Sequence, residues 1–403
     1  MSEEKYSTQV TRRGFLKTVG LGGLGAVAAS GLAATAVSAV APSQTIPKRR
    51  LGKTGAEVSI LSLGGMFDTI NNQLLLKQAL SWGITHWDTA EAYGNGMSEE
   101  GMGRFFTRNP DTRKQIFLVT KLTPKAGNFT ERFEKSLQRL KTEYVDLFLV
   151  HGISGVEEMT PAIKEWAAAM KQAGKMKFFG FSTHANMEDC LLGAANLDWI
   201  DAVMFTYNFR LMPTDKMKQA VAACVAAGIG LTAMKSQGGG PVKTDSQAEL
   251  DMAGRFLERG FTDKQAKLKA IWENPHLTTI CSQMPNLTIL ASNVAAARDQ
   301  TTLAREDFEA LQLFAQESCV GYCAGCGSIC SQVAGGVPIN DVMRCLMYHR
   351  DYNDPDLARS TFASLGVAVR EGLVAQDYAA AEQACPQGLA IATLMHEAAT
   401  LLG

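Results

Sequence analysis

The sequence carries almost no net charge and no long run of like charges. Its 39 Lys and Arg residues balance 40 Asp and Glu residues, leaving a net charge of −1 over 403 residues. A basic excess would indicate nucleic acid, and a charge run would indicate a membrane surface. Their absence argues against a nucleic-acid partner. No internal repeat or low-complexity linker is evident, and the length suits one large domain plus a smaller one.

Cysteine is scarce over most of the chain and concentrated at its C-terminal end. Three of the nine cysteines are scattered through the first 300 residues: Cys190, Cys224 and Cys281. The other six lie in the last 85 residues: Cys319, Cys323, Cys326, Cys330, Cys345 and Cys385. This contrast predicts a distinct cysteine-rich module at residues 315–403, which we call the C-terminal module.

The N-terminal segment has the composition of an export signal. Arg12 and Arg13 precede a weakly apolar, Gly/Ala-rich stretch at residues 19–41. This resembles a twin-arginine signal, whose pathway carries folded proteins. We therefore expect residues 1–41 to direct export to the periplasm, and an uncleaved signal would anchor the protein in the inner membrane. A soluble Ala-rich helix is the alternative, which the glycines at 20, 22, 23 and 25 disfavour.

From residue 49 onward, short apolar runs alternate with stretches of helical periodicity. After a short hairpin at residues 50–59, the strand candidates are 59–63, 85–88, 116–121, 145–151, 177–182, 202–206, 230–234 and 278–282. The helix candidates between them include 71–81, 98–108, 130–141 and 156–173. Eight such units favour an α/β fold of the (β/α)₈ TIM-barrel type over residues 49–305. No Gly-x-Gly-x-x-Gly follows the first strand, which argues against an open dinucleotide-binding sheet.

Reactive side chains fall where the predicted strands end, which is where barrel enzymes hold their active sites. Asp88, Lys121 and His151 close the second, third and fourth strands, and Tyr93 follows Asp88 in the loop. A tyrosine can donate a proton to a carbonyl oxygen if a nearby cation stabilises its anion. Lys121 is that cation, Asp88 holds it charged, and His151 orients the carbonyl. These four residues predict a carbonyl reductase that takes its hydride from a cofactor.

The sequence around these residues resembles that of the aldo-keto reductase family. Residues 87–94 have the sequence WDTAEAYG, and Ser98-Glu99 follows them. The next two strands end in Thr120-Lys121 and Leu149-Val150-His151. The resemblance extends from Leu51 to about Asn293 and implies a small carbonyl substrate with NADP or NAD. By position, it implies these cofactor-binding residues: Gly64, Gly65, Met66, Asp88, Ser182, Thr183, Tyr207, Met234, Lys235, Ser236, Asn286 and Asn293.

The expected cofactor contacts depart from the family pattern in three places. Thr183 stands where Asn is usual, and Met204 stands where Gln is usual. The segment 282–286 lacks the glycine that usually opens this turn. The proton-transfer residues are therefore complete, whereas the residues that hold the cofactor are altered.

The cysteine spacing in the C-terminal module resembles bacterial ferredoxin ligation. A subgroup of aldo-keto reductases carries two [4Fe–4S] clusters in such a tail, and here half of that ligand pattern is missing. The surviving positions match the four ligands of one cluster: Cys323, Cys326, Cys330 and Cys385. The resemblance thus implies one retained [4Fe–4S] cluster, with Cys319 a possible substitute ligand and Cys345 a buried thiol. A structural zinc site, disulfides or no metal are the alternatives.

The remainder of the tail is predicted to be helical, at residues 339–348, 355–365, 377–384 and 389–402. These helices should return Cys385 to the other cysteines. Two functions stay open. The first is an exported NAD(P)-dependent reductase that carries a cluster and exchanges electrons with a redox partner protein. The second is a non-catalytic redox-sensing or structural subunit with relaxed cofactor binding. A pure electron carrier would not need Tyr93 and Lys121.

Overall fold

The computed structural model describes residues 45–124, 128–239, 246–319 and 321–403. The predicted export signal lies outside the described residues. Residues 42–403 form one compact unit, so the barrel and the C-terminal module belong to the same body. Among the described residues, no helix is both long enough and apolar enough to span a bilayer.

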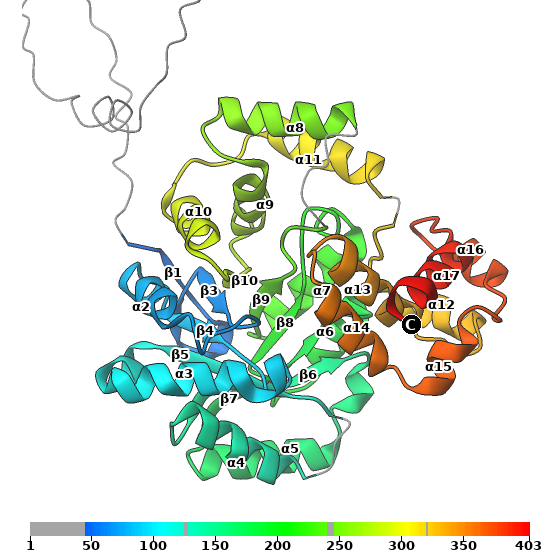
Figure 1. The fold of residues 1–403 in the computed structure, drawn as a ribbon. Coiled ribbons are helices and arrows are strands. Elements are labelled where there is room, and N and C mark those ends of the chain that lie inside the picture. Colours follow the sequence, from blue (N-terminus) through cyan, green and yellow to red (C-terminus); the bar gives the residue numbers. More distant parts are fainter. Residues whose placement is uncertain (1–44, 125–127, 240–245, 320) are drawn as a thin grey trace, which may run out of the picture. The chain divides into compact units, whose positions relative to one another are not determined.

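Eight parallel strands close into a barrel (Figure 1). In chain order they are β3 (Leu61–Gly64), β4 (His86–Asp88), β5 (Phe117–Leu122), β6 (Val145–Ile153), β7 (Met176–Thr183), β8 (Ala202–Thr206), β9 (Gly230–Met234) and β10 (Thr279–Gln283). Strand β10 pairs with both β9 and β3, which closes the ring. The predicted (β/α)₈ fold is confirmed, and each predicted strand overlaps an observed one.

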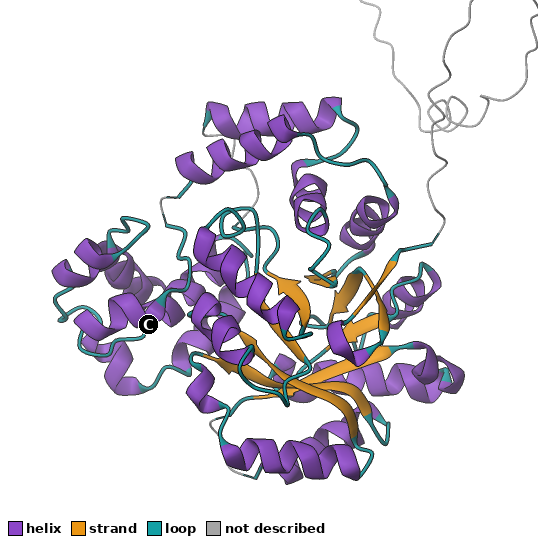
Figure 2. Ribbon diagram, turned by 180° about the vertical axis from the view of Figure 1, so that it is seen from behind, coloured by secondary structure: helices purple, strands orange, loops and turns teal. Residues whose placement is uncertain are grey.

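Helices surround the strands and cover their outer faces (Figures 1 and 2). They are α2 (Gln73–Ser81), α3 (Met97–Arg108), α4 (Phe129–Leu140), α5 (Pro161–Gln172), α6 (Met187–Ala194), α7 (Asp215–Ala226), α9 (Asp263–Trp272) and α10 (Leu287–Arg298). An additional pair, α8 (Gln247–Glu258) and α11 (Arg305–Glu317), lies side by side at the top of Figure 1, where Arg255 and Arg259 form ion pairs with the buried Asp307.

The predicted hairpin closes the amino ends of the barrel strands. It consists of the antiparallel strands β1 (Lys48–Arg50) and β2 (Glu57–Ser59). The Arg49 guanidinium donates to three carbonyl oxygens in the segment before β10, those of Trp272, Asn274 and Leu277. The opposite, carboxyl ends of the strands are left for loops and for the C-terminal module.

One predicted helix is divided in the structure. The range 156–173 is a short 3₁₀ turn at Val156–Glu158 followed by α5, which begins at Pro161. Thr160 has extended backbone angles (φ −70°, ψ 162°), and its hydroxyl accepts a hydrogen bond from the Ile163 N–H. Because the residue before a proline avoids the helical region, Thr160 caps a new helix and ends the earlier one.

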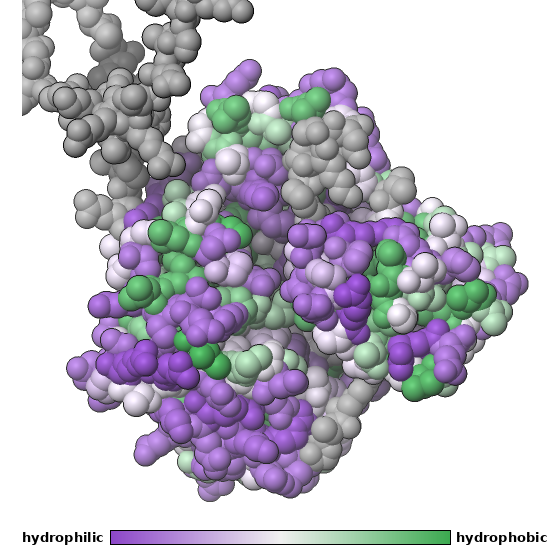
Figure 3. Space-filling view, in the orientation of Figure 1, coloured by the Kyte–Doolittle hydropathy of each residue, from purple (hydrophilic) through white to green (hydrophobic). Residues whose placement is uncertain are grey.

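The C-terminal module is helical, as predicted (Figure 2). It has its own apolar core. Its helices are α12 (Gly327–Val333), α13 (Ile339–Arg350), α14 (Pro355–Ala363), α15 (Val367–Gly372), α16 (Ala379–Ala384) and α17 (Ile391–Leu402). It also exposes apolar side chains, among them Ile329, Val333, Val367 and Val374 at 40% to 57% exposure. Green patches lie among purple ones over this part of the surface in Figure 3.

Specific contacts attach the module to the carboxyl end of the barrel. Asn208, just past β8, donates to the Tyr322 hydroxyl at 3.0 Å. Asn186, just past β7, donates its backbone N–H to the Gly325 carbonyl at 2.8 Å and accepts from the Ser328 N–H at 2.9 Å. The module therefore lies against the end of the barrel where the predicted reactive residues are.

Candidate active site

The four predicted catalytic residues converge at the carboxyl ends of β4, β5 and β6. The Lys121 ammonium donates to Asp88 Oδ2 at 2.7 Å and to the Tyr93 hydroxyl at 3.3 Å. The Tyr93 and His151 rings meet edge to face, with centroids 5.7 Å apart. Asp88 and Lys121 each expose 1% of their surface. The arrangement is a buried, connected chain from carboxylate to ammonium to phenol, with an imidazole beside it.

Local backbone geometry places Tyr93 in this cluster. It begins a short 3₁₀ segment, Tyr93–Gly96, in which Gly94 and Asn95 both have positive φ, 57° and 54°. Glycine and asparagine are the residues that adopt this left-handed region most readily. The turn redirects the chain from the end of β4 into α3 and leaves the phenol beside Lys121.

Burial and the Asp88–Lys121 ion pair set the charge states of the site. Burial alone would lower the pKa of Lys121, but the Asp88 carboxylate and Tyr93 raise it above its ordinary value, so Lys121 stays charged. Burial raises the pKa of Tyr93, and Lys121 opposes that shift only in part. Tyr93 is therefore protonated at neutral pH, which is the state a proton donor needs.

His151 is neutral and lacks a protein partner at one ring nitrogen. Burial lowers its pKa to about 3, and the charges of Lys121 and Arg344 act in the same direction. Among the described residues, no group hydrogen-bonds to the buried His151 Nδ1. A neutral imidazole with an unoccupied position can donate a hydrogen bond to a substrate carbonyl.

Two further side chains support the cluster and were not predicted. The Cys281 thiol of β10 lies beside Asp88, and burial raises its pKa, so it packs there as a neutral group. Glu99 of α3 is fully buried, accepts from the Thr120 hydroxyl at 2.6 Å and pairs with Arg139. Glu99 belongs to the Ser98-Glu99 motif of the family resemblance, but the motif did not indicate its contacts with Thr120 and Arg139. The lone Cys281 carries no distinguishing signal, because its position depends on how β10 packs.

The cofactor positions near β3 and β10 lie where two backbones approach closely. A Cβ on Gly65 would lie 2.8 Å from the Asp88 carbonyl oxygen, so this position admits only glycine. The Gln283 side chain donates to the Met66 carbonyl at 2.5 Å. Asn286 caps α10 by accepting from the Ile289 N–H at 3.0 Å, and Asn293 donates to the Ser282 hydroxyl at 3.0 Å. A Cβ on Gly64 would be 3.1 Å from the backbone of Ser282.

The cofactor positions after β7 and β8 are largely occupied by internal contacts. The Ser182 hydroxyl accepts from the Gly152 N–H at 3.0 Å, and the Thr183 hydroxyl donates to the Ala185 carbonyl at 2.6 Å. Tyr207 is 3% exposed, belongs to the core between strands and helices, and accepts from Asn274 at 3.1 Å. Tyr207 thus stands apart from the other predicted cofactor residues.

The positions after β9 differ in how far they are open. Met234 and Ser236 are buried, with 9% and 5% exposure, whereas Lys235 is half-buried and has a positive φ of 52°. The Lys235 ammonium lies over the Tyr348 ring at 4.8 Å and is 4.0 Å from the Met347 sulfur, both in α13. Lys235 is therefore the predicted cofactor residue that the C-terminal module covers.

The comparison with known protein families decides the identity of the barrel. A sequence model described as the Aldo/keto reductase family matches residues 63–305, more than half of the chain. The chain belongs to the aldo/keto reductase family. This confirms the resemblance of the motifs around Asp88, Lys121 and His151, and the match ends before the C-terminal module.

Aldo-keto reductases recur among the relatives. The protein named aldo-keto reductase yakc [NADP(+)] of Schizosaccharomyces pombe is 32% identical over 160 residues, which cover 34% of this chain and 46% of that protein. An uncharacterized oxidoreductase of Bacillus subtilis, YrpG, is 26% identical over 57% of this chain and 84% of its own length. The chain thus spans about half the length of the first of these two relatives.

A further relative is not named as an enzyme. It is described as a candidate voltage-gated potassium channel subunit beta of Schizosaccharomyces pombe, with 30% identity over 36% of this chain and 47% of that protein. Among solved structures, an aldo-keto reductase of Klebsiella pneumoniae in complex with NADPH superposes with a TM-score of 0.55 and 23% identity, covering 67% of this chain and 95% of that one. At this identity the likeness concerns the fold.

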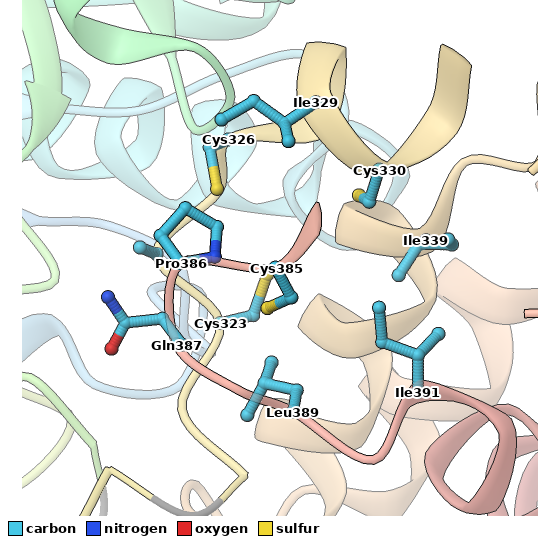
Figure 4. A pocket seen from close by; sticks show the side chains of 11 residues that line it. Cys323, Cys326, Ile329, Cys330, Ile339, Cys385, Pro386, Gln387, Leu389 and Ile391 are labelled. Carbon is cyan, nitrogen blue, oxygen red and sulfur yellow. The ribbon is translucent and has the colours of Figure 1, made fainter. Parts of the chain in front are cut away.

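Outside the family match, four cysteines of the C-terminal module line one pocket (Figure 4). They are the four predicted cluster ligands: Cys323, Cys326, Cys330 and Cys385. The pocket has about 330 Å³ of empty space, and its other walls are mainly apolar, formed by residues such as Ile329, Ile339 and Leu389. The described cysteines form no disulfide. Cys319 does not line this pocket, and Cys345 is fully buried elsewhere.

The thiols of this pocket interact electrostatically, which shows that they share one space. Burial raises the pKa of Cys323 to about 12, and neighbouring Cys326, Cys330 and Cys385 add to that shift. Burial likewise raises the pKa of Cys326 to about 11. Among the described residues, no three Cys, His, Asp or Glu side chains are close enough to hold a single metal ion.

A second cleft lies between the aldo/keto reductase barrel and α13. Its walls include His184 past β7, Lys235 past β9, and Arg344 and Tyr352 from the C-terminal module, and it has about 650 Å³ of empty space. This cleft could not be predicted from the sequence, because α13 is far from the barrel motifs in the chain and reaches them only through the packing of the module.

Proposed function

We propose that the protein is an exported NAD(P)-dependent aldo-keto reductase that reduces a small carbonyl compound and carries one [4Fe–4S] cluster. The observation that carries the reductase is the Lys121 ammonium, which lies 2.7 Å from Asp88 Oδ2 and 3.3 Å from the Tyr93 hydroxyl. A buried cation beside a phenol stabilises the phenolate, so the phenol can donate its proton when negative charge develops on a nearby oxygen.

The nicotinamide cofactor would supply the hydride to the carbonyl carbon. As that carbon is attacked, the Tyr93 hydroxyl transfers its proton to the carbonyl oxygen, and the product is an alcohol. Lys121 stabilises the phenolate that Tyr93 becomes, and Asp88 keeps Lys121 charged. Neutral His151 donates a hydrogen bond to the same oxygen and orients it. Solvent then returns a proton to Tyr93.

The residues that would hold the cofactor are only partly open for it. Lys235 offers a positive charge for a phosphate, whereas a side chain on Gly64 or Gly65 would meet protein atoms rather than open space. The Thr183 hydroxyl already donates to the Ala185 carbonyl, whereas the Ser182 hydroxyl accepts from the Gly152 N–H and keeps its own O–H available as a donor. These residues support binding of NADP or NAD and do not distinguish between the two cofactors.

Nucleotide release and turnover test the reductase. The protein is purified anaerobically, any bound nucleotide is released by denaturation, and carbonyl turnover is followed with NADPH and NADH. The Tyr93→Phe variant should lose roughly 10²–10⁴-fold in kcat, because the proton donor is removed while the ring remains. Absence of nucleotide binding at millimolar cofactor would contradict the proposal.

The cysteine pocket supports the cluster. Four thiols from α12, the loop before it and the segment before α17 converge on one mainly apolar space. Cysteine thiolates are the ligands of [4Fe–4S] clusters, and these four residues would hold one in the pocket.

Matched cysteine variants test the cluster. Anaerobically purified protein should absorb in the visible range and contain iron and acid-labile sulfide in equal amounts. Cys385→Ala should lose this absorption, whereas Cys345→Ala, which removes a buried thiol outside the pocket, should retain it. A colourless, iron-free protein of unchanged stability would contradict the cluster, and zinc in its place would support the structural alternative.

Export and a redox partner complete the proposal. The paired arginines support periplasmic localisation, and replacing Arg12 and Arg13 by lysine should retain the protein in the cytoplasm. A membrane association is expected only if the signal stays uncleaved. The apolar Ile329 beside the cysteine pocket, 40% exposed, offers a contact for a partner protein that exchanges electrons with the cluster.

The alternative is a non-catalytic redox-sensing or structural subunit. It is supported by the altered cofactor positions Thr183 and Met204 and by the relative named as a channel subunit. The two functions differ in turnover. A subunit could bind nucleotide, but its state would not depend on the Tyr93 hydroxyl, so wild type and Tyr93→Phe would be equally inactive.

A further inference from the structure

The cleft between the barrel mouth and α13 has two positive side chains on opposing walls. Lys235 comes from the end of β9, and Arg344 comes from the middle of α13. Among the described residues, Lys235 forms no ion pair, and its ammonium faces the Met347 sulfur and the rings of Tyr348 and Tyr352. Burial and the charge of Arg344 lower the pKa of Lys235 well below its ordinary value, and an anion in the cleft would stabilise its charged form.

Arg344 is also incompletely paired. Its one ion pair within the described residues is with Asp341 on the same helix, 3.1 Å away. A guanidinium has five N–H donors, so one carboxylate one turn away leaves donors that can face the cleft. Asn340, also on α13, lines the same cleft and adds a polar amide beside Arg344.

The cleft borders the proposed catalytic site. Its wall includes His184, which follows β7, and β7 pairs with β6, the strand that carries His151. The charge of Arg344 also acts on His151, the residue expected to orient the substrate carbonyl. His184, which lines the cleft, is held neutral by burial and by the charges of Lys235 and Arg344. Asp351 also lines the cleft, and its charge acts on Arg210. Among the described residues that line the cleft, Lys235 and Arg344 are the basic side chains and Asp351 is the one carboxylate, so basic groups outnumber acidic ones.

We propose that this cleft is the substrate pocket and that Arg344 selects carbonyl substrates that carry an anionic group, a carboxylate or a phosphate, whereas Lys235 on the opposite wall remains for a cofactor phosphate. The inference rests on the proposed reductase function and adds its substrate class. Arg344 belongs to the C-terminal module, so the module would contribute the selecting residue to the barrel's active site.

A matched substrate pair tests the selection. 4-Carboxybenzaldehyde and its neutral methyl ester share an aromatic ring and an aldehyde and differ in one negative charge. Arg344→Gln should lower the ratio of their kcat/KM values by roughly 10- to 100-fold, the range expected when a charged hydrogen bond is lost. Arg344→Lys should recover part of the ratio, because it restores the charge without the planar fork.

Arg359→Gln is the matched control. Arg359 lies on α14, is exposed, and pairs with Asp356 at the same helical spacing that joins Arg344 to Asp341. Arg359→Gln therefore removes one positive charge from the module, as Arg344→Gln does, but at a residue that does not line the cleft. An equal loss of selectivity in both variants, or an unchanged ratio in Arg344→Gln, would overturn the inference.

A binding measurement separates this inference from the reductase itself and from the cofactor's own phosphates. Terephthalate, which carries carboxylates and no reducible carbonyl, is titrated into free and NADP⁺-saturated protein. Arg344-dependent binding in both forms supports a substrate site, even if no turnover is seen and the reductase proposal fails. Binding that NADP⁺ abolishes would assign the positive charges to the cofactor and overturn the inference. Turnover without a preference for the anionic aldehyde would overturn it while leaving the reductase intact.

Discussion

The buried ion pair between Asp88 and Lys121 has a structural as well as a chemical role. Both side chains lie inside the barrel with 1% of their surface exposed, at a separation of 2.7 Å. Each charge is tolerated there because the other is present. The same pairing keeps Lys121 charged beside the Tyr93 hydroxyl, so the reactive state of the site and the stability of the barrel depend on one contact.

Removing one partner of the Asp88–Lys121 pair should lower the stability of the fold more than removing both. We expect Asp88→Leu to lower the free energy of unfolding by about 3–5 kcal/mol, because it leaves the Lys121 ammonium buried and unpaired. Combining it with Lys121→Met should recover part of that loss, although activity stays absent. Urea denaturation of the single and double variants measures the difference. If the double variant is less stable than Asp88→Leu, the unpaired Lys121 ammonium is not what lowers the free energy of unfolding.

At the scale of elements, the sequence was most informative where periodicity and motif agreed. The strands that end in Asp88, Lys121 and His151 could be predicted because apolar runs stop at polar residues in the order that a barrel requires. Tyr207 shows the limit of motif matching. Met204 packs inside the barrel and Phe205 packs outside it, and side chains alternate along a strand, so Tyr207 faces outward with Phe205.

The loop that carries Cys323 and Cys326 depends on a glycine at its contact with the barrel. Gly325 has a φ of 83°, and a Cβ there would lie 2.5 Å from the His184 carbonyl oxygen. We expect Gly325→Ala to displace this loop and to lower the stability of the module by about 1–3 kcal/mol. Thermal unfolding and the rate of thiol labelling at Cys323 and Cys326 measure the two effects.

Gly321→Ala is the control for the backbone angle alone. Gly321 has a similar φ of 85°, but a Cβ there would come no nearer than 3.5 Å to the Arg350 side chain. Both variants introduce strain in φ, and only Gly325→Ala adds a collision with the barrel backbone. If the two variants label and unfold alike, the contact between Gly325 and His184 does not hold the loop in place.

At the scale of the whole molecule, the cleft between the barrel and α13 is made by two parts of the chain that the sequence shows separately. The barrel motifs predicted Tyr93, Lys121 and His151, and the cysteine spacing predicted that four thiols of the module share one location. Neither pattern indicates that α13 packs over Lys235, because that contact depends on the docking of Tyr322 and Gly325 against loops after β7 and β8. The positive cleft exists only in the assembled molecule.

Buried neutral histidines should make the whole fold sensitive to acid. Burial lowers the pKa of both His86 and His151 to about 3, against an ordinary value of 6.5. Between these values the unfolded chain binds protons that the folded protein does not, so stability is complete above pH 6.5 and falls as the pH is lowered. Each histidine should contribute a slope of about 1.4 kcal/mol per pH unit.

His86 allows this dependence to be measured without touching the proposed catalytic residues. Its ring nitrogens have no partners among the described residues, and it packs edge to face on Phe117 at 5.2 Å. His86→Leu should flatten the dependence of unfolding free energy on pH between 5 and 6.5 by about 1.4 kcal/mol per unit. Phe117→Leu disturbs the same contact but removes no titratable group, so it should shift the stability at every pH and leave the slope unchanged. Equal slopes in wild type and His86→Leu would mean that His86 is not the group that couples folding to protons.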